Sequence, residues 1–205
     1  MCKNSCKVVF LDRDGTMNVE VNYLHRKEDL KLIDGTAEAV RLLNEAGYKV
    51  IVITNQAGVA RGYYTEADVK ILHDYMNEVL ERDGAHVDAF YYCPHHPEHG
   101  IGIYKKKCHC RKPETGMFEM AERDLPEGID KVHSYMIGDK RIDAQAGKNF
   151  GVTGVLVGTG YGAKEHAEDR AAGLIKEDGS CPAGGYDAYA DTLLDAVRGI
   201  LGGRI

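Results

Sequence analysis

Short apolar runs alternate with longer amphipathic segments along this chain. Runs of β-branched and other apolar residues bounded by Gly, Asp or Asn are typical of buried strands. Such strands are predicted at residues 7–11, 48–54, 87–92, 134–138 and 153–157. Between and after them, apolar residues recur at helical spacing. The predicted helices cover residues 35–46, 65–82, 116–123, 142–149 and 189–201.

Strands that alternate with helices indicate βαβ units, and therefore a parallel sheet covered by helices on both faces. The predicted fold class is α/β, a Rossmann-like doubly wound sheet. Because 205 residues make one ordinary domain, we expect residues 1–205 to form a single domain. The segment 163–189 is polar and rich in glycine, so it is interpreted as a longer or partly ordered loop before the last helix.

Polar residues follow three of the predicted strands. Asp12 and Asp14 come after the first strand, Thr54 and Asn55 end the second, and Asp139 follows the fourth. In open parallel sheets, ligands bind outside the carboxyl ends of the strands. These residues should therefore share one site.

The acids at these strand ends suit a divalent metal ion. Two carboxylates in one turn repel each other unless a cation or a shared proton offsets their charge. Mg²⁺ prefers oxygen ligands, so Asp12, Asp14 and Asp139 are candidates to hold it beside a substrate phosphate. One carboxylate can then attack phosphorus while another moves protons. The alternative for residues 12–16 is an Asx-type turn without chemistry.

A cluster of cysteines and histidines lies between residues 93 and 110. Two ligand pairs provide one nitrogen and three sulfurs, a set that suits a closed tetrahedral Zn²⁺ site: Cys93 with His95, and Cys108 with Cys110. Such a zinc would be structural, because no position remains open for a catalytic water. The alternatives are a segment without metal, or another histidine in place of His95, namely His96, His99 or His109.

Four motifs in the order LDRDGT, ITNQ, RKP and IGDK resemble those of the haloacid dehalogenase-like (HAD) phosphohydrolases. The longer stretches VITNQAGVARGYYTE, YYCPHHPE, CHCRKPETGM and SYMIGDKRIDAQAG resemble the D-glycero-D-manno-heptose 1,7-bisphosphate 7-phosphatase branch, to which histidinol-phosphate phosphatases are related. The resemblance spans roughly residues 8–160. It implies a HAD-like fold with a zinc-stabilised loop at residues 93–110 and no large cap domain.

The resemblance also implies roles for individual residues. Asp12 would be the nucleophile that forms an aspartyl-phosphate, and Asp14 would protonate the leaving oxygen and then activate water. Asp12, the backbone carbonyl of Asp14, and Asp139 would hold Mg²⁺. The residues expected to contact the phosphoryl group or the rest of the substrate are Asp12, Arg13, Asp14, Glu20, Val21, Asn22, Tyr23, Thr54, Asn55, Gln56, Ala57, Arg111, Lys112 and Lys140.

Some of these residues have a structural alternative. Lys112 would bring positive charge to the phosphoryl group, or it is a surface lysine. Lys140 would orient Asp139, or it is an exposed residue at a helix start. Asp143 is expected to cap or brace the following helix rather than bind metal, and Arg61 is interpreted as structural.

Composition narrows the class of function. The formal charge of −6 argues against a nucleic-acid surface, and no apolar run approaches the roughly 20 residues that cross a bilayer. We therefore expect a cytoplasmic protein without nucleic-acid or membrane partners, and the resemblance implies a monomer. The reaction that the resemblance implies removes the 7-phosphate of a heptose bisphosphate during nucleotide-activated heptose synthesis. Histidinol phosphate is the alternative substrate. The alternative from a different class of function is a zinc-stabilised binding module without catalytic activity.

Overall fold

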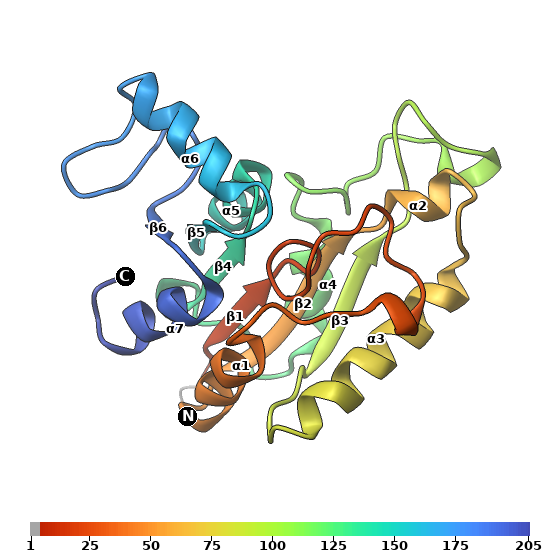
Figure 1. The fold of residues 1–205 in the computed structure, drawn as a ribbon, viewed down its shortest axis with the longest axis horizontal. Helices are drawn as coiled ribbons and strands as arrows, with labels where there is room; N and C mark the ends of the chain where they lie inside the picture. Colours follow the sequence, from red (N-terminus) through yellow and green to blue (C-terminus); the bar gives the residue numbers. More distant parts are fainter. Residues whose placement is uncertain (1–4) are drawn as a thin grey trace.

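Residues 5–205, which the computed structural model describes, contain a parallel sheet of six strands in the order β3-β2-β1-β4-β5-β6 (Figure 1). The strands are β1 (Val8–Leu11), β2 (Lys49–Asn55), β3 (Ala89–Cys93), β4 (Tyr135–Gly138), β5 (Thr153–Val157) and β6 (Ala188–Ala190). The order reverses at β1, which pairs with β2 on one side and β4 on the other. Such a reversal opens a crevice at the carboxyl ends of these strands.

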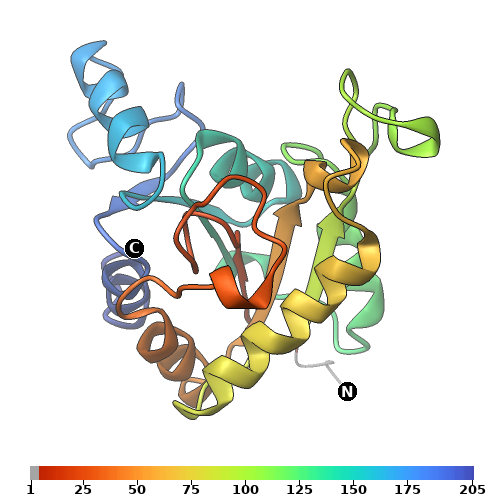
Figure 2. The same ribbon diagram turned by 45° about the vertical axis from the view of Figure 1, so that its right-hand side comes forward.

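Helices cover both faces of the sheet (Figures 1 and 2). They are α1 (Thr36–Glu45), α2 (Ala57–Ala60), α3 (Glu66–Glu81), α4 (Gly116–Asp124), α5 (Arg141–Phe150), α6 (Gly162–Ala171) and α7 (Leu193–Leu201), with 3-10 turns η1 (Lys27–Asp29), η2 (Gly102–Tyr104) and η3 (Lys131–His133). Successive strand residues point to opposite faces. In β1, Val9 and Leu11 belong to the core with α1, α3 and α7, and Val8 and Phe10 to the core with α4 and α5. The predicted doubly wound fold is confirmed.

The ends of the predicted helices follow from local chemistry. Thr65 begins α3 with a capping box, in which its hydroxyl accepts from the Asp68 N–H and the Asp68 carboxylate accepts from the Thr65 N–H. Gly47 follows α1 at φ 78°, in the left-handed region that favours glycine.

The carboxyl-terminal part differs from the expectation. The segment interpreted as a loop contains α6, and residues expected to open the last helix form β6. α6 has no clear apolar stripe, and its acids instead hold Arg141, whose Nε donates to Asp169 Oδ2 at 3.0 Å. β6 is a short edge strand of half-buried residues. Neither element carries a strong periodic pattern, so the sequence did not predict them.

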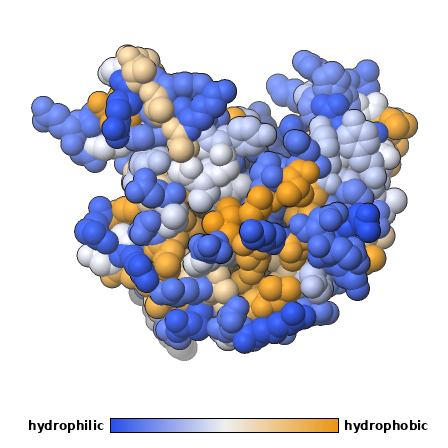
Figure 3. Space-filling view, in the orientation of Figure 1, coloured by the Kyte–Doolittle hydropathy of each residue, from blue (hydrophilic) through white to orange (hydrophobic). Residues whose placement is uncertain are grey.

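Apolar surface gathers near the middle of the face seen in Figure 3, where the loop after β1 crosses the sheet in Figure 1. Val19 and Val21 in this loop are 38% and 44% exposed. Within residues 5–205, every helix is too short or too polar to span a bilayer.

Candidate active site

Three buried carboxylates meet in the crevice beside β1. Asp12 follows β1, Asp139 follows β4, and Asp143 lies in the first turn of α5; one oxygen of each lies within 4.8 Å of the others. Burial first, and then the neighbouring acids, raise the pKa of Asp139 to about 8. Burial also raises the pKa of Asp12 to about 6, against the opposing charge of Lys112. Three carboxylates this close repel one another, so a further cation is needed for all of them to be ionised.

One oxygen of Asp139 is free to bind such a cation. Its Oδ1 is buried and has no hydrogen-bond partner among the described residues, while its Oδ2 accepts from the backbone N–H of Tyr161 at 3.0 Å. A Cβ at Gly15 or Gly160 would lie 2.3 or 2.1 Å from Asp139 Oδ2, so only glycine leaves room for this carboxylate. The carboxylate oxygens at this site therefore fit a small, hard ion such as Mg²⁺ as its ligands.

Lys112 provides the buried positive charge of the cluster. Its Nζ donates to Asp12 Oδ1 at 2.6 Å and to the Ile53 carbonyl at 2.8 Å, and lies 2.8 Å from Asp143 Oδ1. Burial disfavours the ammonium, but the two carboxylates outweigh that effect and raise the pKa of Lys112. The alternative that Lys112 is a surface lysine is wrong, because its side chain is 1% exposed.

Two neighbours position Lys112. Asn55 accepts from the Lys112 N–H through Oδ1 at 3.1 Å and donates Nδ2 to the Lys112 carbonyl at 3.3 Å. Asp143 also accepts a hydrogen bond from the Lys140 N–H. It therefore both caps α5 and holds the Lys112 side chain. The sequence predicted the cap from the place of Asp143 near the helix start, but it carried no signal for the contact with Lys112.

Asp14 is held by a separate buried network. Arg13 Nη2 donates to Asp14 Oδ2 at 2.8 Å, Asn18 Nδ2 to Oδ1 at 3.1 Å, and Gln56 Nε2 to Oδ2 at 2.9 Å. Burial would raise the pKa of Asp14, but the Arg13 guanidinium and these hydrogen bonds hold it below its ordinary value. Asp14 is therefore a carboxylate at neutral pH in this structure.

Arg13 and Gln56, which were expected to contact the substrate, both donate side-chain hydrogen bonds to Asp14, and Gln56 also lines a cavity beside it. Arg13 has no exposed surface, and it donates to the Leu24 carbonyl and lies 3.3 Å from His73 Nε2. Burial and then the Arg13 charge lower the pKa of His73 to about 3, so His73 is neutral. Gln56 uses both amide hydrogens on Asp14 and Thr54, and its oxygen accepts from Arg13 and Tyr64. These side chains position Asp14.

A cavity of about 270 Å³ opens over the cluster. It is lined by Asp12, Asp14, Glu20, Thr54, Asn55, Arg111, Lys112, Lys140, Ile142 and Asp143. A neighbouring cavity of about 190 Å³ shares Asp14, Glu20 and Asn55 and adds Asn22, Tyr23, Gln56, Ala57 and Tyr64. Val21 lines neither of them, and its side chain is exposed. The two cavities suit a small polar substrate.

Lys140 reaches from the start of α5 toward this cavity. Its Nζ lies 3.9 Å from Glu20 Oε2 and 4.0 Å from Asp139 Oδ1, and 4.6 Å from the centre of the Tyr161 ring. Burial opposes the charge, but Asp139 and the other nearby acids outweigh it and raise the pKa of Lys140. The side chain is only 32% exposed, so Lys140 is not simply a surface residue at a helix start.

A larger cavity lies elsewhere and lacks this chemistry. It measures about 590 Å³ and lies between the start of α3 and η2. Its lining includes three tyrosines, two isoleucines and the acids Glu66 and Asp68. Glu66 already accepts from the Tyr92 and Tyr104 hydroxyls, and Asp68 accepts from Thr65. The smaller cavity over the carboxylates is therefore the candidate active site.

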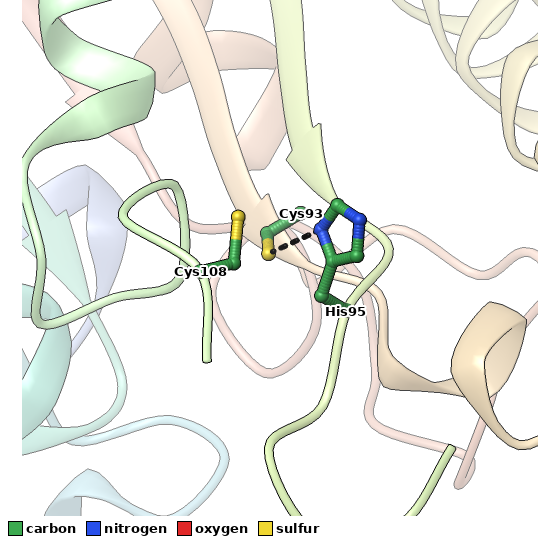
Figure 4. A group of neighbouring side chains, drawn as sticks. All are labelled: Cys93, His95 and Cys108. Atoms are coloured by element: carbon green, nitrogen blue, oxygen red, sulfur yellow. Dashed lines mark hydrogen bonds between the residues drawn. The ribbon is translucent and has the colours of Figure 1, made fainter. Parts of the chain in front are cut away.

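Three of the four expected zinc ligands lie together (Figure 4). One ligand atom each of Cys93, His95 and Cys108 lies within 4.8 Å of the others, and Cys93 Sγ is 3.8 Å from His95 Nδ1. Cys110 falls outside this group, although a hydrogen bond with Cys108, after burial, raises its thiol pKa. Burial raises the pKa of Cys93 to about 12. Two thiols and an imidazole fit a zinc ion.

The other histidines of this segment point away from the thiols. His96 Nδ1 accepts from the N–H groups of Glu98 and His99. His109 lies 3.0 Å from the Glu119 carboxylate, on the side of α4. Among the histidines of residues 93–110, His95 is thus the one that faces Cys93 and Cys108.

Comparisons with known proteins identify relatives of this chain. A sequence-family model described as "HAD-hyrolase-like" matches residues 109–178. A D-glycero-beta-D-manno-heptose-1,7-bisphosphate 7-phosphatase of Haemophilus ducreyi is 46% identical, over 80% of this chain and 90% of that protein. A D-glycero-alpha-D-manno-heptose-1,7-bisphosphate 7-phosphatase of Photorhabdus laumondii is 40% identical, over 82% of this chain and 92% of that protein.

A solved structure shares the whole fold. It is the D,D-heptose 1,7-bisphosphate phosphatase from B. bronchiseptica, complexed with magnesium and phosphate. It is 30% identical to this chain with a TM-score of 0.78, and the match covers 96% of this chain and 99% of that one.

Proposed function

This chain belongs to the D-glycero-D-manno-heptose-1,7-bisphosphate 7-phosphatase family of HAD-like phosphoric monoester hydrolases, and we propose that it removes the 7-phosphate of a heptose 1,7-bisphosphate. The observation that carries the proposal is the contact of the buried Lys112 ammonium with Asp12, beside the free oxygen of Asp139. A carboxylate nucleophile and a cation for the phosphoryl group are thereby within one small cavity.

In the first half of the reaction, Asp12 attacks phosphorus and the bond to the sugar oxygen breaks. The products are an aspartyl-phosphate and the dephosphorylated sugar, whose leaving oxygen takes a proton from the protonated form of Asp14. This step therefore uses the minor form of Asp14, because its neighbours hold the pKa of this carboxyl below its ordinary value. Lys112 stabilises the negative charge on the phosphoryl oxygens. The Thr54 hydroxyl accepts from Gln56, so its own hydrogen remains free to donate to a phosphoryl oxygen.

In the second half, Asp14 takes a proton from water, which attacks the aspartyl-phosphate and releases inorganic phosphate. The low pKa of Asp14 suits this step, because the carboxylate form is the one that accepts a proton. Asp12, the Asp14 backbone carbonyl and Asp139 would hold Mg²⁺, as in the sequence-based expectation. When bound, Mg²⁺ would neutralise charge on the transferring group.

The substrate assignment has a direct test. Phosphate release would be measured with MgCl₂ for both anomers of heptose 1,7-bisphosphate and for histidinol phosphate. Because relatives named for either anomer match this chain, both anomers belong in the assay. We expect kcat/KM for one anomer to exceed that for histidinol phosphate at least about tenfold, the effect of one well-placed polar contact. Faster hydrolysis of histidinol phosphate would refute the assignment.

We also propose that Cys93, His95, Cys108 and Cys110 hold a structural Zn²⁺. The segment 94–109 contains only the short turn η2 and has little buried apolar surface, so a metal would offset the entropy lost on ordering it. Arg111 and Lys112 follow the last ligand directly, so this metal would also position the cations of the active site.

Cys110→Ser tests the zinc proposal and the fourth ligand together. We expect zinc content, measured by mass spectrometry of the purified protein, to fall from about one per chain to well below half. Phosphatase activity should fall with it, because Arg111 and Lys112 lose the ordered segment that precedes them, although Asn55 still bonds to the Lys112 backbone. Cys6→Ser is the control, since Cys6 is also half-buried but bonds to the Gly128 carbonyl. Full zinc content in Cys110→Ser would show that Cys110 is not a ligand.

We further propose that the enzyme acts as a monomer in the cytoplasm. The cysteines of the described residues are all free, which agrees with a reducing compartment. Light scattering of the purified protein and fractionation of the source cells test the two parts of this proposal.

A further inference from the structure

A histidine lies on the buried face of α3. His73 is 4% exposed, and its ring stacks on the Phe90 ring of β3 with 4.5 Å between the ring centres. The other buried residues of this helix are Val69, Leu72, Met76 and Leu80. A buried imidazole among apolar residues is costly unless it is hydrogen-bonded. His73 therefore calls for a polar partner inside the protein.

That partner is Arg13, which directly precedes Asp14 in the chain. His73 Nε2 lies 3.3 Å from Arg13 Nη1. A guanidinium only donates hydrogen bonds, so His73 Nε2 carries the lone pair and accepts. Burial first, and then the Arg13 charge, lower the pKa of His73 to about 3, so the imidazole is neutral and able to accept.

This contact holds the nitrogen of the Arg13 guanidinium that Asp14 does not reach. Arg13 Nε and Nη2 donate to Asp14 Oδ1 at 3.2 and 3.1 Å, and Nη2 also donates to Oδ2 at 2.8 Å. The Leu24 carbonyl and Gln56 Oε1 accept from Nη2 too. For Nη1, His73 is the hydrogen-bond partner within residues 5–205. Because the guanidinium is planar and rigid, holding all three nitrogens fixes the direction of the carboxylate that it binds.

We propose that His73, acting through Arg13, positions the Asp14 carboxylate for hydrolysis of the aspartyl-phosphate. The inference rests on the proposed function and names a further residue for its second half. In that step a water oxygen bonds to phosphorus, the bond from phosphorus to the Asp12 oxygen breaks, and Asp14 takes the water proton. A general base acts within hydrogen-bond reach of its water, so a displaced carboxylate slows this step. His73 is a positioning residue, because Arg13 lies between it and Asp14.

The lifetime of the aspartyl-phosphate tests this inference. The protein is mixed with MgCl₂ and p-nitrophenyl phosphate that contains radioactive phosphorus, then with excess unlabelled substrate, and samples are quenched in acid. The measured quantity is the rate constant for loss of the protein-bound label. Nitrophenolate leaves with little help from an acid, so kcat/KM for this substrate reports the first half of the reaction. A fraction of unfolded protein lowers the amount of label but not its rate constant.

His73→Met and His73→Gln form a matched pair, because the two side chains have nearly the same shape and only glutamine offers an oxygen to Arg13 Nη1. In His73→Met we expect the rate constant to fall about tenfold. This is less than the roughly hundredfold that a general base contributes at least, since the base is displaced and not removed. kcat/KM, corrected for the amount of label, should stay near the wild-type value. His73→Gln should restore the wild-type rate constant, and His86→Met, which changes an exposed histidine, should alter neither quantity.

Two results would overturn the inference and leave His73 a core residue without a part in the reaction. The first is an unchanged rate constant in His73→Met, and the second is an equal fall in His73→Met and His73→Gln. In both cases the wild type still gains and loses the label, so the proposed function stands. If the wild-type protein takes up no label, the aspartyl-phosphate mechanism fails and the inference fails with it.

Discussion

Replacing Asp12 with asparagine should reduce phosphate release at least about a thousandfold, as expected when a covalent nucleophile is removed. The amide has nearly the shape of the carboxylate, and its oxygen can still accept from Lys112 Nζ, which lies 2.6 Å from Asp12 Oδ1. Lys112 also keeps its contact with Asp143. The fold should therefore survive, so the loss should appear in kcat. Release of inorganic phosphate with saturating MgCl₂ is the measurement.

The matched control for this experiment is Asp74→Asn. Asp74 lies on the exposed side of α3, away from the carboxylate cluster, so this change should leave the rate unaltered. Thermal unfolding of both variants shows whether the fold is intact. An Asp12→Asn enzyme with more than about a tenth of the wild-type rate would contradict the aspartyl-phosphate mechanism.

Replacing Lys112 with methionine should destabilise the fold by about 3–5 kcal/mol, since it removes one partner of a buried ion cluster. Asp12 and Asp143 would then face each other without the cation that bridges them at 2.6 and 2.8 Å. Methionine fills a volume similar to that of lysine, so the loss of stability would come from the missing charge and not from a cavity. The rate should also fall at least about a hundredfold, because the phosphoryl oxygens lose this charge. Urea unfolding and phosphate release measure the two effects.

A second variant separates charge from packing. In the double variant Lys112→Met with Asp143→Asn, one of the two repelling carboxylates is gone, so part of the lost stability should return. Lys164→Met is the control, because Lys164 is exposed on α6. If Lys112→Met unfolds at the same urea concentration as Lys164→Met, then Lys112 does not neutralise the cluster.

The sequence predicted the central elements because their signals are local. Strands β1 to β5 are short apolar runs, and the predicted ranges differ from them by at most about two residues at each end. Motif residues at strand ends share one site because parallel strands end at the same edge of a sheet. Asp12 and Asp139 were therefore expected together, whereas Lys112 was expected there only from the family resemblance. In the structure, Asp12 and Asp139 belong to one carboxylate cluster, and Lys112 donates to Asp12.

Elements without a local pattern were missed. α2 spans only Ala57–Ala60, α6 has a largely polar sequence, and β6 is a three-residue edge strand. These elements depend on contacts that are distant in sequence, such as that of Arg141 with Asp169. Propensity alone does not reveal such contacts.

By itself, the sequence determined the fold class, the order of the motifs and the residue types available for chemistry, since each depends on hydrophobic period and spacing. Only the tertiary structure decided what each polar side chain faces. It turned Arg13 and Gln56 inward to hold Asp14, and left Asp139 Oδ1 without a hydrogen-bond partner among residues 5–205. The physical reason is that burial and pairing of a charge are set by groups from several strand ends at once, and no local stretch of sequence contains them all.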